Sequence, residues 1–178
     1  KWIPMPSLLR ETMTQYKLRR QLKDTKIRTW WRFWASPFDK KKFTDDLDAL
    51  SNFYKDEGHR DFTILSDSVY YSKKKKGLIV RINILEGSKY KFRNFSWEGN
   101  SLYGENVLQS ALNLNKGDIF SQTGFDKAVF QDVQSLYMDR GYLYSNIEPF
   151  FTPAGKDSMD VHFSVTENNK VYVRNINI

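Results

Sequence analysis

The sequence contains the same segment twice. Residues 43–61 align with residues 126–144 at an offset of 83 positions. The aligned pairs match in size or identity: Leu50 and Val133, Tyr54 and Tyr137, Asp56 and Asp139, Gly58 and Gly141. Further along, residues 86–94 align with residues 167–175 at an offset of 81 positions. A repeat of this length indicates a string of similar modules and argues against a single enzyme active site.

Length and composition fit two small modules. The 178 residues allow two units of roughly 85 residues, and aromatic residues, at 16% of the chain, supply large apolar side chains for two small cores. No stretch approaches the roughly 20 apolar residues of a membrane-spanning helix. No signal peptide is visible at the start, so we expect a mature chain or an excised fragment. Cysteine is absent, which excludes disulfides and thiolate metal sites.

The net charge and the positions of the histidines limit the classes of function that the chain could have. The net charge is +7, with basic runs at residues 17–23, 40–42 and 73–76. Such runs suit nucleic acid, an anionic membrane surface or an acidic partner, and equally solvated helix faces and loop tips. His59 and His162 lie in unrelated repeat contexts, and metal-binding, phosphate-binding and nucleophile motifs are absent. We therefore expect no enzyme, no cofactor, no metal site and no nucleic-acid partner.

The second repeat predicts the order β-α-α-β-β. Alternation predicts a strand over residues 89–97, with a slip in phase near Asn94. Helical spacing predicts helices over residues 105–114 and 125–140, the latter ended by Gly141. Its predicted apolar stripe is Val129, Phe130, Val133, Leu136 and Tyr137. Strands are predicted over 142–151 and 159–166, and one face of the last carries Met159, Val161, Phe163 and Val165.

The first repeat follows the same order with one gap. We predict helices over residues 16–23 and 40–57, and hairpin strands over 62–71 and 78–85. Residues 1–13 should hold the first strand, but they contain two prolines and match poorly. Residues 170–178 repeat the pattern of 89–97. The predicted boundaries are therefore 1–88 and 89–168 for two modules, with 169–178 as the start of a third.

These features resemble the POTRA domain. The resemblance is carried by Leu136-Tyr137-Met138-Asp139-Arg140-Gly141-Tyr142, Trp97-Glu98-Gly99-Asn100 and Lys116-Gly117-Asp118-Ile119-Phe120. It implies an α+β fold of tandem β-α-α-β-β modules, each a three-stranded mixed sheet covered by two helices. POTRA arrays belong to outer-membrane assembly factors of the Omp85 family, and these motifs look most like the BamA branch. The aromatic insert and tyrosine-rich hairpins look like the Bacteroidetes form.

The resemblance also implies a function and partners. The chain would be a non-catalytic scaffold on the periplasmic face of the bacterial outer membrane, followed by its own C-terminal membrane β-barrel. Unfolded outer-membrane proteins, accessory lipoproteins of the assembly complex and periplasmic chaperones would be its partners. A POTRA region that serves two-partner secretion or autotransporter assembly is the alternative.

In the POTRA fold the second strand of each module is a sheet edge, to which an extended client can add by main-chain hydrogen bonds. The predicted client-binding residues on these edges are Tyr142, Tyr144, Ile147, Phe150, Phe151, Phe62, Ile64, Val69 and Tyr70. The alternative is that the aromatic residues fill small cores and that Pro149 blocks its edge.

The aromatic insert is a second candidate contact. Trp30, Trp31, Phe33 and Trp34 stand close together between the predicted helices of the first repeat. They are too apolar to be fully exposed, so we expect them to pack between modules, to contact a partner lipoprotein or to lie at the membrane interface.

Overall fold

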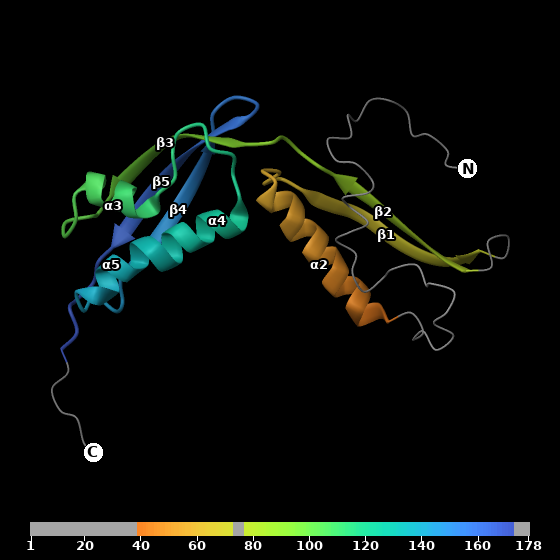
Figure 1. Ribbon diagram of the computed structural model, residues 1–178, viewed down its shortest axis with the longest axis horizontal. Helices are drawn as coiled ribbons and strands as arrows, with labels where there is room; N and C mark the ends of the chain where they lie inside the picture. The colour runs from red at the N-terminus through yellow and green to blue at the C-terminus, as the bar shows by residue number, and fades with distance from the viewer. Residues whose placement is uncertain (1–38, 73–76, 173–178) are drawn as a thin grey trace, which may run out of the picture. The chain divides into compact units, whose positions relative to one another are not determined.

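The computed structural model describes residues 39–72 and 77–172 (Figure 1). The predicted first strand and first helix, the aromatic insert at Trp30, Trp31, Phe33 and Trp34, and residues 173–178 lie outside the described residues. The chain divides into two compact units, Lys1–Phe53 and Tyr54–Ile178.

Helix α2 spans Lys40–Asp56, which confirms the prediction for residues 40–57 to within one residue. Asp39 precedes the helix, and its Oδ1 accepts a hydrogen bond of 2.9 Å from the amide of Lys41. A carboxylate at this position satisfies an amide that has no partner within the helix. Phe43 and Leu50, both 4% exposed, are spaced seven residues apart and so lie on one face of the helix.

A hairpin follows α2. Strand β1 spans Thr63–Ser72 and pairs antiparallel with β2, Gly77–Leu85. The register shifts between Ile64 and Ser66, so Leu65 is an extra residue in β1. The Tyr54 ring stacks on the Phe62 ring with their centroids 4.2 Å apart, which ties the last turn of the helix to the start of the hairpin.

The second repeat builds a three-stranded mixed sheet. Strands β3, β4 and β5 span Lys91–Glu98, Asn146–Pro153 and Ser158–Thr166. Their order is β3-β5-β4, with β5 parallel to β3 and antiparallel to β4. The last strand, β5, therefore lies at the centre, and β4, the second strand of the repeat, is an edge as predicted. The predicted slip in phase is also present, because the β3–β5 register shifts between Phe92 and Asn94.

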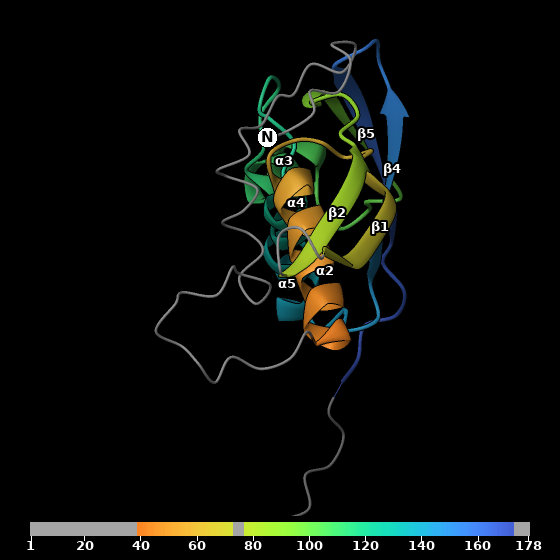
Figure 2. The ribbon, with the colours of Figure 1, turned by 90° about the vertical axis from the view of Figure 1, so that its right-hand side faces the viewer.

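Helices cover one face of this sheet (Figures 1 and 2). Helix α3 spans Glu105–Leu112 and ends two residues before the prediction, because Asn113 adopts a left-handed conformation with φ 50°. The second helix is continuous and has three parts. These are α4, a π-helical segment η1 and α5, spanning Gln122–Lys127, Ala128–Val133 and Gln134–Asp139.

The core lies between these helices and β5. All four predicted inward residues of β5, namely Met159, Val161, Phe163 and Val165, are at most 5% exposed. The helix contributes Val129, Val133 and Tyr137, each fully buried. The prediction that Phe130 belongs to the buried stripe is wrong, because its side chain is 51% exposed. The buried residues Val129, Val133 and Tyr137 are spaced four residues apart, and Phe130, one position after Val129, points to a different side of the helix.

The predicted start of the second strand at residue 142 is also wrong. The strand begins at Asn146 and not at Tyr142, because residues 142–145 form a turn. The amide and the hydroxyl of Ser145 both bond to the carbonyl of Tyr142, at 3.2 and 2.8 Å. The buried amide Nε2 of Gln134 then donates to the carbonyl oxygen of Ser145 at 2.7 Å, which fixes the turn against the helix.

Matched tyrosines of the two repeats should respond differently to loss of the hydroxyl. Tyr54 donates to Glu86 Oε1 at 2.9 Å, whereas the buried Tyr137 hydroxyl has no hydrogen-bond partner among residues 39–72 and 77–172. We expect Tyr54→Phe to lower the free energy of unfolding by about 1–2 kcal/mol, and Tyr137→Phe to leave it unchanged or raise it by about 1 kcal/mol. Urea denaturation measures both, and an equal loss in the two variants would contradict the assignment.

The raised pKa of Tyr137 also predicts that the stability of the fold depends on pH. Burial, together with the charges of Glu167 and Tyr103, raises the pKa of Tyr137 from 10.0 to about 12. Between these values the unfolded chain loses this proton while the folded chain keeps it, so stability falls as the pH rises from 10 to 12. The fall should be shallower in Tyr137→Phe than in the parent chain. Urea midpoints at pH 9, 10 and 11 test this, and identical slopes would refute it.

Candidate functional site

Two strands, β1 and β4, carry the predicted client-binding residues. Among the described residues β1 pairs only with β2, and β4 pairs only with β5. Each strand therefore has one side whose amides and carbonyls have no ladder partner in this part of the chain. Such a side is where a further strand can add.

Two prolines reduce the number of backbone hydrogen-bond donors on the open side of β4. Pro149 and Pro153 both lie within the strand. A proline in a strand turns its nitrogen, which carries no hydrogen, toward the open edge. Because backbone groups alternate in direction along a strand, Ile147 and Phe151 turn their amides the same way. The open side of β4 thus offers donors at Ile147 and Phe151 and none at the two prolines.

The open side of β1 has no such interruption. None of the residues from Thr63 to Ser72 is proline, so each carries an amide hydrogen. Leu65, Tyr70 and Tyr71 are 63%, 41% and 63% exposed. The extra residue at Leu65 twists the strand and hinders pairing there. The regular stretch of β1 therefore runs from Ser66 onward.

The predicted edge residues fall into three groups. Phe62 and Ile147 are 5% and 1% exposed, so their side chains lie in the cores, and only their main chains could meet a client. Tyr142 and Tyr144 lie in the turn before β4, because the strand begins later than predicted. The remainder lie on the strands: Tyr70 and Phe150 are exposed, and Ile64, Val69 and Phe151 are half-buried.

Polar side chains cross the outer face of the sheet. Arg93 makes a two-point ion pair with Asp160, through Nε to Oδ1 at 2.8 Å and through Nη2 to Oδ2. The hydrogen bond from Arg93 lowers the pKa of the Asp160 carboxyl, and the same bond raises the pKa of Arg93. These residues lie on neighbouring strands, so the pair contributes to holding β3 against β5.

His162 bridges two residues of β3. Its Nδ1 lies 2.9 Å from Ser96 Oγ and its Nε2 lies 3.1 Å from Glu98 Oε2. Serine, histidine and a carboxylate also occur together in hydrolases. Here, however, the side chains of His162 and Glu98 are 41% and 74% exposed, and a catalytic group of this kind works in a site that excludes water. The three residues are best explained as a cross-strand contact. Sequence reasoning could not pair His162 with β3.

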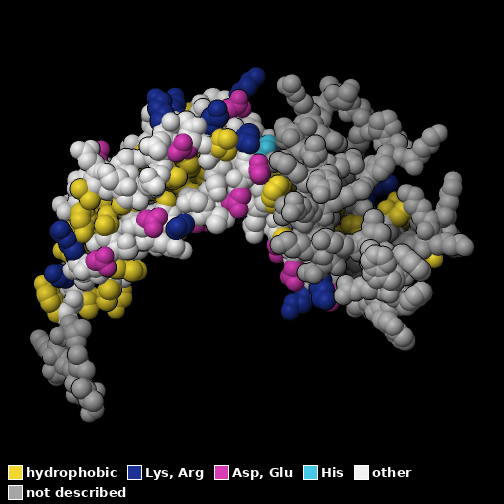
Figure 3. All heavy atoms as spheres, in the orientation of Figure 1, with side chains coloured by type: hydrophobic (Ala, Val, Ile, Leu, Met, Phe, Trp, Pro, Cys, Tyr) yellow, Lys and Arg dark blue, Asp and Glu magenta, His cyan; other side chains and the backbone are white. Residues whose placement is uncertain are grey.

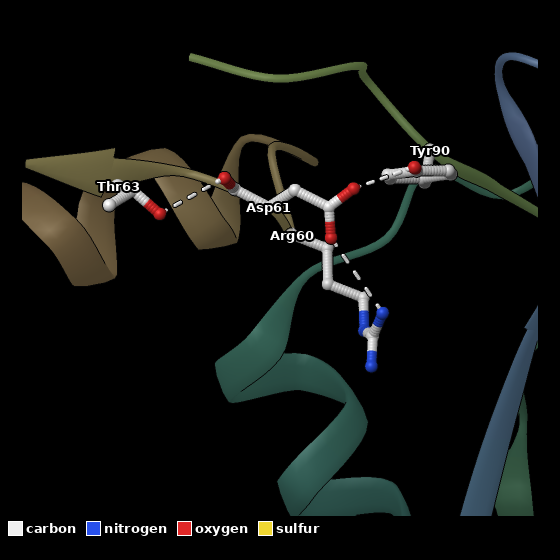
Figure 4. A network of polar contacts seen from close by, with 4 residues as sticks. All are labelled: Arg60, Asp61, Thr63 and Tyr90. Carbon is white, nitrogen blue, oxygen red and sulfur yellow. Dashed lines mark hydrogen bonds and ion pairs between the residues drawn. The ribbon is translucent and has the colours of Figure 1, made fainter. Parts of the chain in front are cut away.

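A polar network joins the turn after α2 to Tyr90, the residue before β3 (Figure 4). Tyr90 donates its hydroxyl to Asp61 Oδ2 at 2.7 Å and its amide to the Gly58 carbonyl at 2.9 Å. The hydrogen bond to Asp61 raises the pKa of Tyr90. Arg60 lies 3.8 Å from Asp61 and 4.4 Å from the centre of the Phe151 ring. These contacts all fall within Tyr54–Ile178.

Asp56 makes a second link to the next repeat. Its Oδ1 accepts hydrogen bonds from the Ser121 hydroxyl at 3.1 Å and from the Thr123 amide at 2.8 Å. Its Oδ2 accepts a bond from the Thr123 hydroxyl at 2.9 Å. Ser121 is the N-cap of α4, so the carboxylate lies at the end of the helix where negative charge is favoured. Sequence reasoning missed this contact, although the matching Asp139 marked the position as part of the repeat.

The sequence matches a known protein family. A profile described as POTRA, surface antigen variable number repeat, matches residues 10–87 and again residues 90–168. The chain belongs to the POTRA family. This confirms the resemblance carried by the sequence motifs, and the mixed sheet under two helices in the second repeat confirms the predicted fold class.

Relatives of this POTRA chain include outer membrane protein assembly factors BamA. The protein of Neisseria meningitidis is 27% identical over 165 residues, which is 91% of this chain and 21% of that protein. The protein of Buchnera aphidicola is 25% identical over 152 residues, which is 83% of this chain and 24% of that protein. The chain thus spans about a fifth of the length of the curated relatives it matches.

Solved structures share the POTRA fold. The POTRA3-5 segment of Haemophilus influenzae BamA superimposes with a TM-score of 0.70 at 23% identity, covering 92% of this chain and 65% of that one. BamA from Haemophilus ducreyi lacking POTRA domains 1-3 gives a TM-score of 0.62 at 16% identity, covering 88% of this chain and 28% of that one.

Two features are absent from the described POTRA residues. Residues 39–72 and 77–172 contain no group of three or more histidine, cysteine, aspartate or glutamate residues that could hold a metal ion. Within the same residues, no helix is both long enough and apolar enough to cross a membrane.

The Asp56 contact should stabilise the start of α4. We expect Asp56→Ala to lower the free energy of unfolding by about 1–2 kcal/mol, because three hydrogen bonds to a carboxylate are lost. The amide proton of Thr123 should shift upfield in NMR spectra. Asp48→Ala, an exposed residue of the same helix, is the matched control. If both variants left the Thr123 resonance in place, the contact would not form in solution.

Proposed function

We propose that this chain is a periplasmic scaffold for outer-membrane protein assembly, and that it binds extended segments of unfolded barrel proteins along β1. The proposal rests mainly on the open side of β1, where no proline removes a backbone donor between Thr63 and Ser72. Membership of the POTRA family and the assembly-factor names of the relatives support the process.

Strand addition suits such a client. The affinity comes from main-chain hydrogen bonds, which depend little on the side chains of the incoming segment. Strands of membrane barrels alternate apolar and polar residues, so one face of an added strand is apolar. The exposed Tyr70 and Tyr71 point to opposite faces of β1, so the apolar face of the client would lie beside one of them. The site therefore recognises the tendency to form a strand and not one motif.

Strand β4 would contribute much less main-chain binding. Its two outward donors, at Ile147 and Phe151, are separated by Pro149, and Pro153 follows. A client strand would meet a missing donor at every second outward position. We therefore assign β4 a side-chain role: Phe150 is 52% exposed and offers an apolar contact for an accessory lipoprotein or a chaperone of the assembly machinery.

A peptide that matches one strand of a membrane barrel tests the proposal. Its affinity for the chain is compared with that of the same peptide N-methylated at alternate residues, which removes backbone donors and keeps every side chain. We expect N-methylation on one of the two alternating phases to weaken binding at least tenfold, because it removes the hydrogen bonds to β1. Equal affinities for the parent and both methylated peptides would refute strand addition.

The position of the peptide is checked by photo-crosslinking. A crosslinking residue replaces Tyr71 on β1, and in separate variants it replaces Phe150 on β4 or Phe130 on the helical side. All three side chains are more than half exposed, at 63%, 52% and 51%. We expect capture at Tyr71 and background levels at Phe130. Capture confined to Phe150 would move the client to β4 and overturn the assignment.

A further inference from the structure

Strand β1 carries a single charged side chain, Asp67, and this side chain lies on the apolar face of the hairpin. Asp67 pairs with Ile82 across the ladder, and Val69, which pairs with Val80, follows on the same face of β1. Tyr71 is the next residue on that face and is 63% exposed. Asp67 is exposed as well. A carboxylate therefore interrupts a row of apolar side chains on the strand that is proposed to receive clients.

The other face of β1 finds its polar partners within the hairpin. Ser66 Oγ accepts a hydrogen bond from Asn83 Nδ2 at 2.7 Å. Arg81 pairs with Ser68 across the ladder, and its guanidinium carbon lies 5.9 Å from the centre of the Tyr70 ring. Arg81 is the one basic residue of β2, so the cation of the hairpin strands lies on the face opposite to the carboxylate.

Asp67 has no such partner. Within residues 39–72 and 77–172, no hydrogen bond or ion pair involves its side chain. Acidic and basic side chains of the second repeat, in contrast, lie close to one another, as Figure 3 shows and as the Arg93–Asp160 pair illustrates. A charge on the apolar face of an edge strand opposes pairing with any strand that offers no counter-charge, because the carboxylate would lose water without compensation.

We propose that Asp67 selects the client segments that add to β1, by favouring a lysine or arginine directly across from it. This inference rests on the proposed binding of clients along β1, and it states which segments bind there. An added strand places one side chain across from Asp67, with the two Cβ atoms about 5 Å apart. An acidic side chain there meets a like charge, whereas a basic one replaces the lost water with an ion pair.

The apolar neighbours of Asp67 complete the preferred pattern. Val69 and Tyr71 lie two and four residues after it on the same face, so apolar client residues fit across from them. A client antiparallel to β1 then reads apolar-x-apolar-x-basic, and a parallel client reads basic-x-apolar-x-apolar. A slip of one residue would turn the basic side chain to the face where Arg81 lies. The same contact therefore fixes the register of the client.

Long-range electrostatics would give the opposite preference. The chain carries a net charge of +7, which attracts acidic segments and repels basic ones. A higher affinity for a basic peptide would therefore report a local contact and not the overall field of the protein.

Three synthetic peptides test the selection. Each has about ten residues, the length of a barrel strand, and alternates apolar and polar residues. The test residue lies at the centre of the apolar face, so that either strand direction can place it across from Asp67, and it is lysine, glutamine or glutamate. We expect the parent chain to bind the lysine peptide at least about threefold more tightly than the glutamate peptide. The preference should vanish or reverse in Asp67→Asn, and it should shrink in about 1 M salt.

A transposed variant is the matched control. Asp67→Ser combined with Ser68→Asp keeps the net charge and moves the carboxylate to the face where Arg81 lies directly across. The new carboxylate has a partner within the hairpin, so the lysine preference should be lost, as in Asp67→Asn. Neither variant disturbs a core, because both positions are exposed. A lysine preference that survived the transposition would overturn the proposal.

The remaining outcomes separate this inference from the proposed function. If none of the peptides protects the amides of β1 from hydrogen exchange, strand addition itself fails and the inference fails with it. If all three peptides protect β1 and bind with equal affinity, strand addition stands and selection by Asp67 is wrong. An equal gain in affinity for all three peptides in Asp67→Asn would also overturn selection, because the carboxylate would then only oppose pairing.

Discussion

The inward face of β5 determines much of the second repeat. Met159, Val161, Phe163 and Val165 alternate along the strand, and each is at most 5% exposed under the helices. A strand so buried needs neighbours on both sides, because every backbone group must find a partner away from water. It takes β3 on one side and β4 on the other. The central position of β5 therefore makes β4 an edge, and the same order in the first repeat would make β1 an edge.

An open edge is a hazard as well as a binding surface, and the two edges differ in protection. β4 has two prolines that remove outward donors, whereas β1 has an extra residue near its start and then a regular stretch. Under the proposed function, a chain that receives unfolded proteins in extended form keeps one edge open to them. The difference between β1 and β4 would then allow binding at one edge without exposing both to aggregation.

The sequence predicted those features that depend on local pattern. The alternation of β5, the slip in β3 and the glycine ends of the helices follow from periodicity of two or 3.6 residues and from the freedom of Gly58 and Gly141 at positive φ. Features that depend on side chains from distant segments were missed. The turn before β4 is held by Gln134, and the cap of α4 is supplied by Asp56 from the previous repeat. Neither bond can be read from a local window, and the repeat was the one signal that marked Asp56.

Amide hydrogen exchange on β1, with and without an extended barrel-strand peptide, tests the central claim most directly. The account predicts that alternate amides between Ser66 and Ser72 become protected when the peptide binds, because one backbone direction in every two faces the open edge. The amides of Ile147 and Phe151 on β4 should keep their exchange rates. Protection on β4 with none on β1 would contradict the account.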